Sequence, residues 1–347
     1  MISSRPIIGI TMGDPAGVGP EIIVKTLVRK WVYDQSCPLA VADARVMSQA
    51  VKIALKDLEI HPIAQASDGR FEHGVIDVIH VKCADLSQIK HGKVSAIAGR
   101  AAGRCIEKAV EMAMQGEIDA VVTAPIHKES FQLAGYDFPG HTEFLAHLTG
   151  AEKYTMMLAH DNLRVVHVST HVSLRKALDL VKRGRILDVI RIANDACHQL
   201  GIKQPRIAVA GLNPHASDGG LFGTEESEEI VPAVEDARGE GMVVEGPISP
   251  DIVFARAWGG QCDIVVAMFH DQGHIPLKLV GFSWSQRSHD WDEIHGVNIT
   301  FGLPIIRTSV DHGVAFGKAG KGTASPDSME EAIRVAIQLA RVRRGLS

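Results

Sequence analysis

Short apolar runs alternate with longer amphipathic stretches along this chain of 347 residues. The short runs are rich in β-branched residues, as buried strands are, and the longer stretches repeat apolar residues at helical spacing. This alternation predicts an α/β fold in which helices cover both faces of a parallel or mixed sheet. The predicted strands are 7–11, 75–81, 120–123, 154–158, 165–168, 206–210 and 264–268, and the predicted helices are 20–30, 95–114, 174–181, 185–200 and 327–344.

The length of the chain favours two domains with a cleft over one large domain. No internal repeat and no Pro/Ser-rich linker separates two halves, so the chain is expected to cross between domains more than once. We expect one domain from residues 1–140 with 306–347, and a second from residues 141–305. Residues 281–296 are polar and aromatic without a clear period, which predicts a surface excursion that is either a functional lid or a plain insertion.

Charge and cysteine content narrow the class of partner. The net charge is -5 and the pI about 6.4, and no Lys/Arg block is present, so we expect no nucleic acid and no membrane as partner. A small anionic substrate would then be held by a few local cations. The five cysteines form no CxxC pair and no apolar run approaches the roughly 20 residues of a membrane span, so we expect a cytoplasmic protein with reduced thiols.

The densest cluster of reactive side chains follows the predicted strand 264–268. Residues 269–278 include His270, Asp271, His274 and Lys278. Ligands of open α/β sheets bind at the carboxyl ends of the strands, where this segment is expected to lie.

His171, His215 and His270 each follow a predicted strand. If the three strands end at one edge, these imidazoles form a site for a divalent metal with open positions, which is typical of a catalytic ion. The alternative is that each histidine is an ordinary polar residue at a strand end. His274 could instead face the cofactor or substrate, and His167 is more typical of a core residue.

Candidates for phosphate recognition are a second group of polar residues. Arginine offers two parallel hydrogen bonds to a phosphate or carboxylate, whereas lysine offers a point charge. Three of the candidates flank the excursion and could converge on one ligand. The candidates are His141, Thr142, Lys278, Asn298 and Arg307.

Two glycine-rich segments are candidates for close approach of a ligand. Residues 11–22 run from a strand into a helix, but their glycine spacing differs from the dinucleotide fingerprint, so a structural turn is an equal alternative. Residues 312–326 combine glycines with two lysines. This backbone could wrap an adenosine or a phosphate, or it could be a flexible surface loop.

Together these segments resemble the 4-hydroxythreonine-4-phosphate dehydrogenases of vitamin B6 synthesis, in order and over nearly the whole chain. The matching motifs include Gly-Asp-Pro-Ala-Gly-Val-Gly-Pro-Glu within 11–22, Thr-Ala-Pro-Ile-His-Lys at 123–128, Gly-His-Thr-Glu at 140–143, Gly-Leu-Asn-Pro-His at 211–215, His-Asp-Gln-Gly at 270–273 and the segment 302–313. Segments 165–171 and 273–279 look closer to the branch that acts on D-threonate or D-erythronate 4-phosphate.

The resemblance implies two α/β/α domains similar to those of isocitrate and isopropylmalate dehydrogenases, without a Rossmann fold for the cofactor. It implies a homodimer whose subunits share each active site, and one divalent ion (Zn, Mg, Mn or Co) per site, bound by His171, His215 and His270. NAD or NADP would bind at the loop 312–326, where Gly317 and Lys318 replace a more usual acidic and apolar pair. The residues implied for the cofactor are His312, Gly313, Gly320 and Gly322, and those for the substrate are His141, Thr142, Lys278, Asn298 and Arg307.

The reaction implied is oxidation and decarboxylation of a 4-phosphorylated 3-hydroxy acid. The substrate would be 4-phosphohydroxy-L-threonine, D-threonate 4-phosphate or D-erythronate 4-phosphate. Lys278 or a water would take the alcohol proton. Asp271 would orient a ligand imidazole, or it is only a turn residue.

Three alternatives remain open from the sequence. The dihydrodiol dehydrogenases of aromatic dicarboxylate breakdown share the Asn-Pro-His and His-Asp-Gln-Gly-His motifs, but His141, Thr142 and Arg307 suit a phosphate better. A metal-dependent sugar-phosphate lyase or aldolase would need no redox chemistry, and a non-catalytic sensor of sugar phosphates would need no turnover. Titration with NAD separates the last two from a dehydrogenase.

Overall fold

The computed structural model describes residues 5–82, 86–285, 290–294 and 296–346. The chain divides into two compact units, residues 1–151 with 303–346 and residues 152–302. The boundaries expected from the sequence were 140/141 and 305/306. The first unit therefore contains both ends of the described chain, and the second is a single continuous segment.

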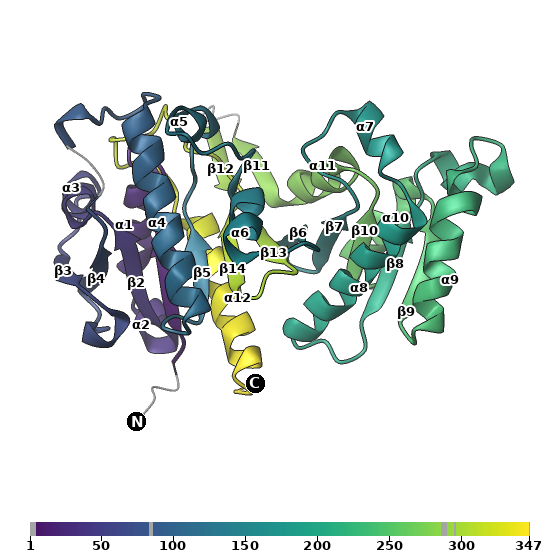
Figure 1. The fold of residues 1–347 in the computed structure, drawn as a ribbon, viewed down its shortest axis with the longest axis horizontal. Coiled ribbons are helices and arrows are strands. Elements are labelled where there is room, and N and C mark those ends of the chain that lie inside the picture. The colour runs from purple at the N-terminus through teal and green to yellow at the C-terminus, as the bar shows by residue number, and fades with distance from the viewer. Residues whose placement is uncertain (1–4, 83–85, 286–289, 295, 347) are drawn as a thin grey trace. The chain divides into compact units, whose positions relative to one another are not determined.

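The first unit has a fully parallel sheet in the order β3-β4-β2-β1-β5-β14. Helix α4 packs on β1, β2 and β5, while α12 packs on the other face against β14 and β5, and α1 lies beside α12 (Figure 1). The strands are β1 Ile7–Thr11, β2 Cys37–Ala42, β3 Glu59–Ile63, β4 Val75–His80, β5 Ala120–Thr123 and β14 Ile306–Val310; the helices are α1 Gly19–Leu27, α2 Lys30–Gln35, α3 Ala44–Ile53, α4 Ala96–Met114, α5 Lys128–Leu133, α6 His141–Thr149 and α12 Asp327–Arg343, with 3-10 turns at Ala66–Asp68 and Leu86–Gln88.

The second unit has a mixed sheet in the order β13-β6-β7-β10-β8-β9. The pairs from β7 to β9 are parallel, and β6 pairs antiparallel with both neighbours. The strands are β6 Thr155–His160, β7 Leu163–His167, β8 Arg206–Ala210, β9 Val243–Ile248, β10 Ile264–Ala267 and β13 Val297–Phe301; the helices are α7 Leu174–Asp179, α8 Arg183–Gln199, α9 Val231–Gly239, α10 Pro250–Trp258 and α11 His270–Gly281, with a 3-10 segment at Pro214–Gly220 and a π-helical turn at Glu226–Ile230.

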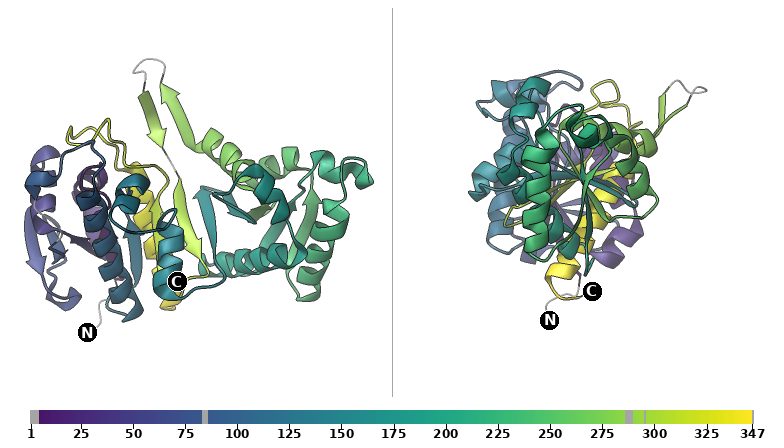
Figure 2. Two further views of the ribbon diagram at one scale, coloured as in Figure 1. Left: turned by 45° about the horizontal axis from the view of Figure 1, so that its top comes forward. Right: turned by 90° about the vertical axis from the view of Figure 1, so that its right-hand side faces the viewer.

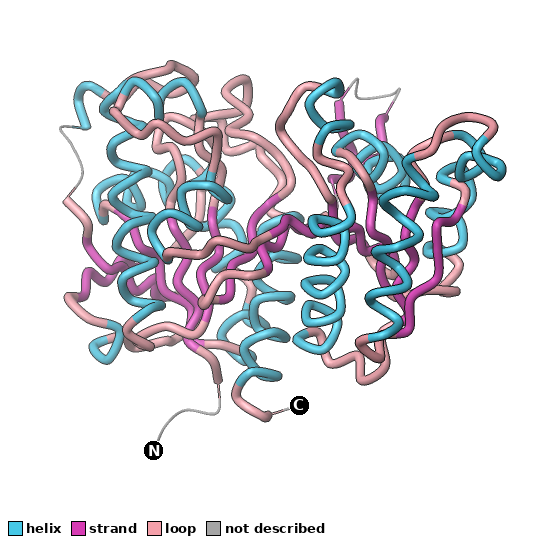
Figure 3. The backbone as a smooth tube through the Cα atoms, turned by 45° about the vertical axis from the view of Figure 1, so that its right-hand side comes forward, coloured by secondary structure: helices cyan, strands magenta, loops and turns pink. Residues whose placement is uncertain are grey.

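In each unit helices lie against the strands of the sheet, as Figure 3 shows. In the second unit a buried core joins β6, β7, β8 and β10 to α10 and α11, and includes Leu158, Val165, Val265 and Leu277. The α/β class predicted from the sequence is confirmed. The strand order of the first unit differs from the 3-2-1-4-5-6 order of a Rossmann fold.

One predicted helix needs correction, and part of the predicted excursion forms regular structure. The predicted helix 20–30 ends at Leu27, and a separate helix α2 begins at Lys30. Part of the predicted irregular excursion forms an antiparallel ribbon of β11 Phe282–Ser285 and β12 Asp290–Ile294, which follows α11 directly (Figure 2). Residues 286–289 and 295 of that excursion lie outside the described residues.

Within the described residues, no helix is long and apolar enough to cross a membrane. Four of the five cysteines are described, and all four are buried free thiols: Cys37, Cys105, Cys197 and Cys262. Cys83 lies outside the described residues.

Candidate functional site

Three neighbouring parallel strands of the second unit lead to the three histidines that the sequence singled out. The strands β7, β10 and β8 are adjacent in the sheet, and His171, His270 and His215 follow their carboxyl ends. The strand order therefore supplies the common sheet edge that the sequence could only assume.

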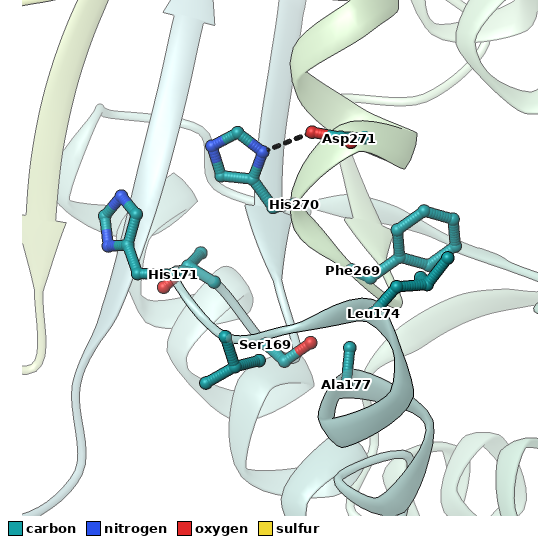
Figure 4. Close-up of a pocket in the computed structure, with 9 residues that line it drawn as sticks. Ser169, His171, Leu174, Ala177, Phe269, His270 and Asp271 are labelled. Carbon is teal, nitrogen blue, oxygen red and sulfur yellow. Dashed lines mark hydrogen bonds and ion pairs between the residues drawn. The ribbon is translucent and has the colours of Figure 1, made fainter.

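His171 and His270 line one pocket of about 250 Å³ (Figure 4). Their ring centroids are 5.7 Å apart. The His270 Nδ1 atom lies 2.6 Å from Asp271 Oδ1 in a hydrogen bond, which leaves the Nε2 atom of His270 as its candidate metal ligand. An imidazole hydrogen-bonded to a carboxylate is typical of metal sites, because the carboxylate fixes the ring and raises its basicity.

His215 does not line this pocket. It lies in a turn where four consecutive non-glycine residues, from His215 to Asp218, have positive φ angles. The buried Glu226 carboxylate holds the start of this turn, since its Oε1 accepts from the backbone N–H groups of Leu212 and Asn213 at 2.8 and 2.7 Å. Such backbone is costly and persists only where its surroundings hold it.

Among the described residues, no group of three or more His, Cys, Asp or Glu side chains is arranged to hold a metal ion. The structure thus brings His171 and His270 together and leaves His215 outside their set. The three-histidine site stays a prediction. Two imidazoles, one oriented by Asp271, fit part of the ligand set of a divalent ion.

A stack of imidazoles continues from His270 into the protein. The ring of His274 stacks on that of His270 with centroids 3.6 Å apart, and the ring of His167 lies 4.8 Å from that of His274. His274 and His167 are 7% and 0% exposed. Burial, with the nearby His270, lowers the pKa of His274 to about 3, and burial also lowers the pKa of His167. Both rings are therefore neutral at physiological pH.

Gly273 permits this arrangement. A Cβ atom on Gly273 would lie 2.4 Å from His167 Nε2 and 2.6 Å from a methyl group of Val165. Helix α11 can pack this closely on β7 only because the residue has no side chain. Sequence reasoning missed α11, although the spacing of His270, His274 and Lys278 at four-residue intervals is the signal that could have revealed one helix face.

Lys278 and Asn298 both belong to the second unit. The Lys278 Nζ atom lies 5.5 Å from the centroid of the Phe282 ring. Asn298 is on β13, and its Nδ2 donates to Met156 Sδ. Its buried Oδ1 has no hydrogen-bond partner within the described part of the chain.

The remaining predicted substrate residues form a cationic site in the first unit. Arg307 is on the buried strand β14, is 2% exposed, and donates from Nη2 to Thr123 Oγ1 at 2.8 Å. Burial lowers the pKa of Arg307 to about 9, and the nearby Glu143 opposes this shift. Besides this bond and the nearby Glu143 charge, a guanidinium offers paired donors of the kind that bind phosphate.

His141 and Thr142 are the first two residues of α6, near this arginine. The pKa of His141 is lowered well below its usual value by burial and by the charge of Arg307. Its buried Nε2 has no hydrogen-bond partner among the described residues. Gly140 caps α6 without a side-chain hydrogen bond, so the backbone N–H groups of the first turn, with the positive end of the helix dipole, favour an anion here.

The loop 312–326, proposed for the cofactor, lies in the first unit and follows β14. Two of its predicted cofactor residues, Gly320 and Gly322, donate their backbone N–H groups to the buried carboxylate of Glu21. Those amides are therefore bound within the protein rather than directed at a ligand. His312 and Gly313 lie nearer the start of the loop, and burial lowers the pKa of His312.

Residues 34–336 match the family model described as pyridoxal phosphate biosynthetic protein PdxA. The chain belongs to the PdxA family. The family resemblance inferred from the sequence is thereby confirmed.

The similar proteins include curated enzymes and solved structures. D-threonate 4-phosphate dehydrogenase from Salmonella typhimurium is 48% identical over 335 residues, which cover 96% of this chain and 98% of that enzyme. The structure of 4-hydroxythreonine-4-phosphate dehydrogenase from Klebsiella pneumoniae has a TM-score of 0.85 and 42% identity, and the match covers 97% of this chain and 100% of that one. As a family member with such relatives, the chain is an oxidoreductase.

A terephthalate dihydrodiol dehydrogenase from Burkholderia xenovorans is also similar. Its structure has a TM-score of 0.66 and 29% identity, with 96% of this chain and 98% of that chain covered. This likeness is lower than that to the Klebsiella enzyme, so the 4-hydroxythreonine-4-phosphate dehydrogenase is the nearer comparison of the two.

Proposed function

We propose that this protein oxidises a 4-phosphorylated 3-hydroxy acid with NAD or NADP and releases carbon dioxide from the product. The relationship to D-threonate 4-phosphate dehydrogenase over 96% of the chain supports this proposal most strongly, and makes D-threonate 4-phosphate the first candidate substrate. D-erythronate 4-phosphate and 4-phosphohydroxy-L-threonine are the next candidates, and the Klebsiella structure supports the latter.

The substrate phosphate would bind to Arg307, His141 and Thr142. The guanidinium of Arg307 supplies paired donors and a buried positive charge. The buried Nε2 of His141 and the first turn of α6 add further hydrogen-bonding positions. We assign Asn298 to the substrate as well, through its buried Oδ1.

The pocket of His171 and His270 would hold the divalent ion, with His215 as the third ligand. When bound, such an ion acidifies a coordinated alcohol and polarises the carbonyl that forms from it. Asp271 holds the His270 ring in the required orientation. Lys278 would take the alcohol proton, directly or through a water, and a bound nicotinamide would supply the acceptor for the hydride from C3. The resulting β-keto acid loses carbon dioxide and gains a proton at C2.

The loop 312–326 would bind the adenosine part of the cofactor near His312 and Gly313. A homodimer with shared sites would explain why the described chain by itself leaves His215 away from His171 and His270. A cytoplasmic location is in keeping with the four buried, unbridged cysteines.

A side-by-side turnover assay tests the proposal. NADH or NADPH formation is followed with each of the three phosphorylated acids, with and without divalent ions, and unphosphorylated D-threonate serves as control. We expect the highest kcat/KM with D-threonate 4-phosphate. Absence of nicotinamide reduction with all three acids and all four candidate ions would sink the dehydrogenase proposal and leave the lyase or sensor.

A further inference from the structure

The glycine-rich loop 312–326 is held firmly against helix α1. Glu21 is 1% exposed, and its two carboxylate oxygens accept from the backbone N–H groups of Gly320 at 2.5 Å and Gly322 at 2.9 Å. A buried carboxylate that accepts two amide hydrogen bonds fixes the spacing of those amides, because the bonds are charge-assisted.

Lys25 lies one turn further along α1 and binds the same loop. Its Nζ donates to the carbonyl oxygens of Gly322 and Ala324, both at 2.6 Å. Residues four apart lie on one helix face, so Glu21 and Lys25 bind the loop together. The Glu21 carboxylate accepts from its amides, and the Lys25 ammonium donates to its carbonyls. Burial lowers the pKa of Lys25 and the charge of Glu21 opposes that shift.

The glycines of this region serve the docking of the loop on the protein. Gly320 and Gly322 have φ angles of 76° and 67°, and a Cβ on Gly322 would lie 2.5 Å from the carbonyl oxygen of Ile53. Nearer the start of the loop, Phe316 stacks on the ring of His127 with centroids 4.7 Å apart. Gly313, Ala315 and Gly317 are exposed. The loop therefore has an anchored end at Gly320–Ala324 and an accessible portion before it.

We propose that Glu21 and Lys25 are positioning residues for the nicotinamide cofactor, which hold the loop 312–326 from the α1 side in the shape that binds the adenosine. The inference rests on the proposed function, since it takes that loop as the cofactor site. When the loop is already ordered, cofactor binding does not have to reduce the conformational entropy of the loop. The anchor therefore contributes to cofactor affinity without contacting the cofactor. Neither residue is assigned a contact with the acid substrate.

The test replaces the carboxylate by its isosteric amide, in Glu21→Gln. One amide N–H of the loop would then face an NH₂ group instead of an oxygen. We expect the Kd of NADH or NADPH, measured by fluorescence titration, and the KM of the oxidised cofactor to rise about ten-fold, in line with the loss of a charge-assisted hydrogen bond. The KM of the phosphorylated acid, and kcat at saturating cofactor, should stay within about two-fold.

Two further variants separate positioning from general destabilisation. Asp77→Asn changes another fully buried carboxylate of the same unit, which binds His61 and the Phe71 amide away from this loop. It should lower Tm without a selective loss of cofactor affinity. Lys25→Met leaves the two bonds of Glu21 to the loop in place, so it tests the anchor if Glu21→Gln does not fold, and it should weaken cofactor binding in the same direction.

Two outcomes would overturn this inference but not the proposed function. In the first, both α1 variants bind the cofactor with an affinity within two-fold of the wild-type value. In the second, the variants lose affinity for the cofactor and for the phosphorylated acid equally. Failure of the wild-type protein to bind either nicotinamide would instead overturn the proposed function, and the inference with it.

Discussion

At the scale of single residues, the cationic site of the first unit depends on the buried guanidinium of Arg307. Arg307 lies on strand β14 and is 2% exposed, and its bond to Thr123 fixes the orientation of the guanidinium. Strand β14 was missed from the sequence, but Arg307 was selected because arginine suits phosphate. Residue chemistry therefore predicted the candidate, and the tertiary structure supplies its burial and its bond to Thr123.

Replacing Arg307 with lysine keeps one charge and removes the paired donors. We expect Arg307→Lys to raise the KM of the phosphorylated acid about 10- to 100-fold, as loss of a charge-assisted hydrogen bond does, while cofactor affinity stays the same. Steady-state kinetics measure this. Arg238→Lys, at an exposed arginine of the second unit that donates to Val244 O, is the control. An unchanged KM in Arg307→Lys would remove the phosphate assignment.

Asp271 is the second residue whose role the contacts clarify. The sequence left it as either an orienting carboxylate or a turn acid, and the 2.6 Å contact to His270 Nδ1 favours the former. We expect Asp271→Asn to weaken metal binding about 10- to 100-fold, as loss of such partners does elsewhere. Metal retained after dialysis is measured by atomic absorption. Asp195→Asn, at an exposed position on α8, should retain the wild-type metal content; equal metal content in both variants would contradict the orienting role.

At the scale of elements, contacts distant in sequence tie the last helix of the chain to the first strand. Arg344 follows α12, and its guanidinium binds both oxygens of Asp119 at 2.7 and 2.6 Å. The same carboxylate accepts from the backbone N–H of Ile7. The pair is 25% and 19% exposed, so water screens it only in part.

Removal of that carboxylate should cost more than removal of an exposed one. We expect Asp119→Asn to lower the free energy of unfolding by about 2 kcal/mol, because a partly buried guanidinium and a backbone amide both lose their charged acceptor. The matched variant is Asp236→Asn, whose partner Arg183 is 55% exposed, and it should lower the free energy of unfolding much less, because water screens an exposed pair. Urea denaturation of both variants measures the difference, and equal costs would contradict this account.

At the scale of the whole molecule, buried neutral histidines make stability depend on pH. His167 and His274 have folded-state pKa values below the usual 6.5, with His274 near 3. Unfolding exposes both rings, which then bind protons below pH 6.5. Their contribution to stability is therefore complete above pH 6.5 and is lost as pH falls towards the folded-state values.

Each of the two rings should reduce the free energy of unfolding by about 1.4 kcal/mol per pH unit below pH 6.5. Denaturation between pH 7.5 and about 5, above the range in which carboxylates titrate, measures the slope with chelator present to exclude metal. His167→Gln should remove one ring's share of the slope, and His198→Gln, at an exposed position, should not. A flat profile across this range would refute the account.

The missed elements show where sequence patterns fail. Helix α11 contains Gly273 and Pro276, which oppose a helix, and it forms because Gly273 allows close packing on β7. All five residues of the short strand β14 are buried, but Arg307, Thr308 and Ser309 are polar, so the strand has no apolar pattern. In both cases tertiary contacts outweigh local preference.

The sequence by itself determined the α/β class, the seven strands it predicted, the family resemblance and the types of residue available for metal, phosphate and cofactor. These depend on local periodicity and on side-chain chemistry, which the order of residues states directly. Only the tertiary structure decided that β7, β10 and β8 are neighbours, that His171 and His270 share a pocket without His215, and that Glu21 and Lys25 hold the glycine-rich loop. These three features depend on strand order and on contacts between residues up to about 300 positions apart, which local patterns do not specify.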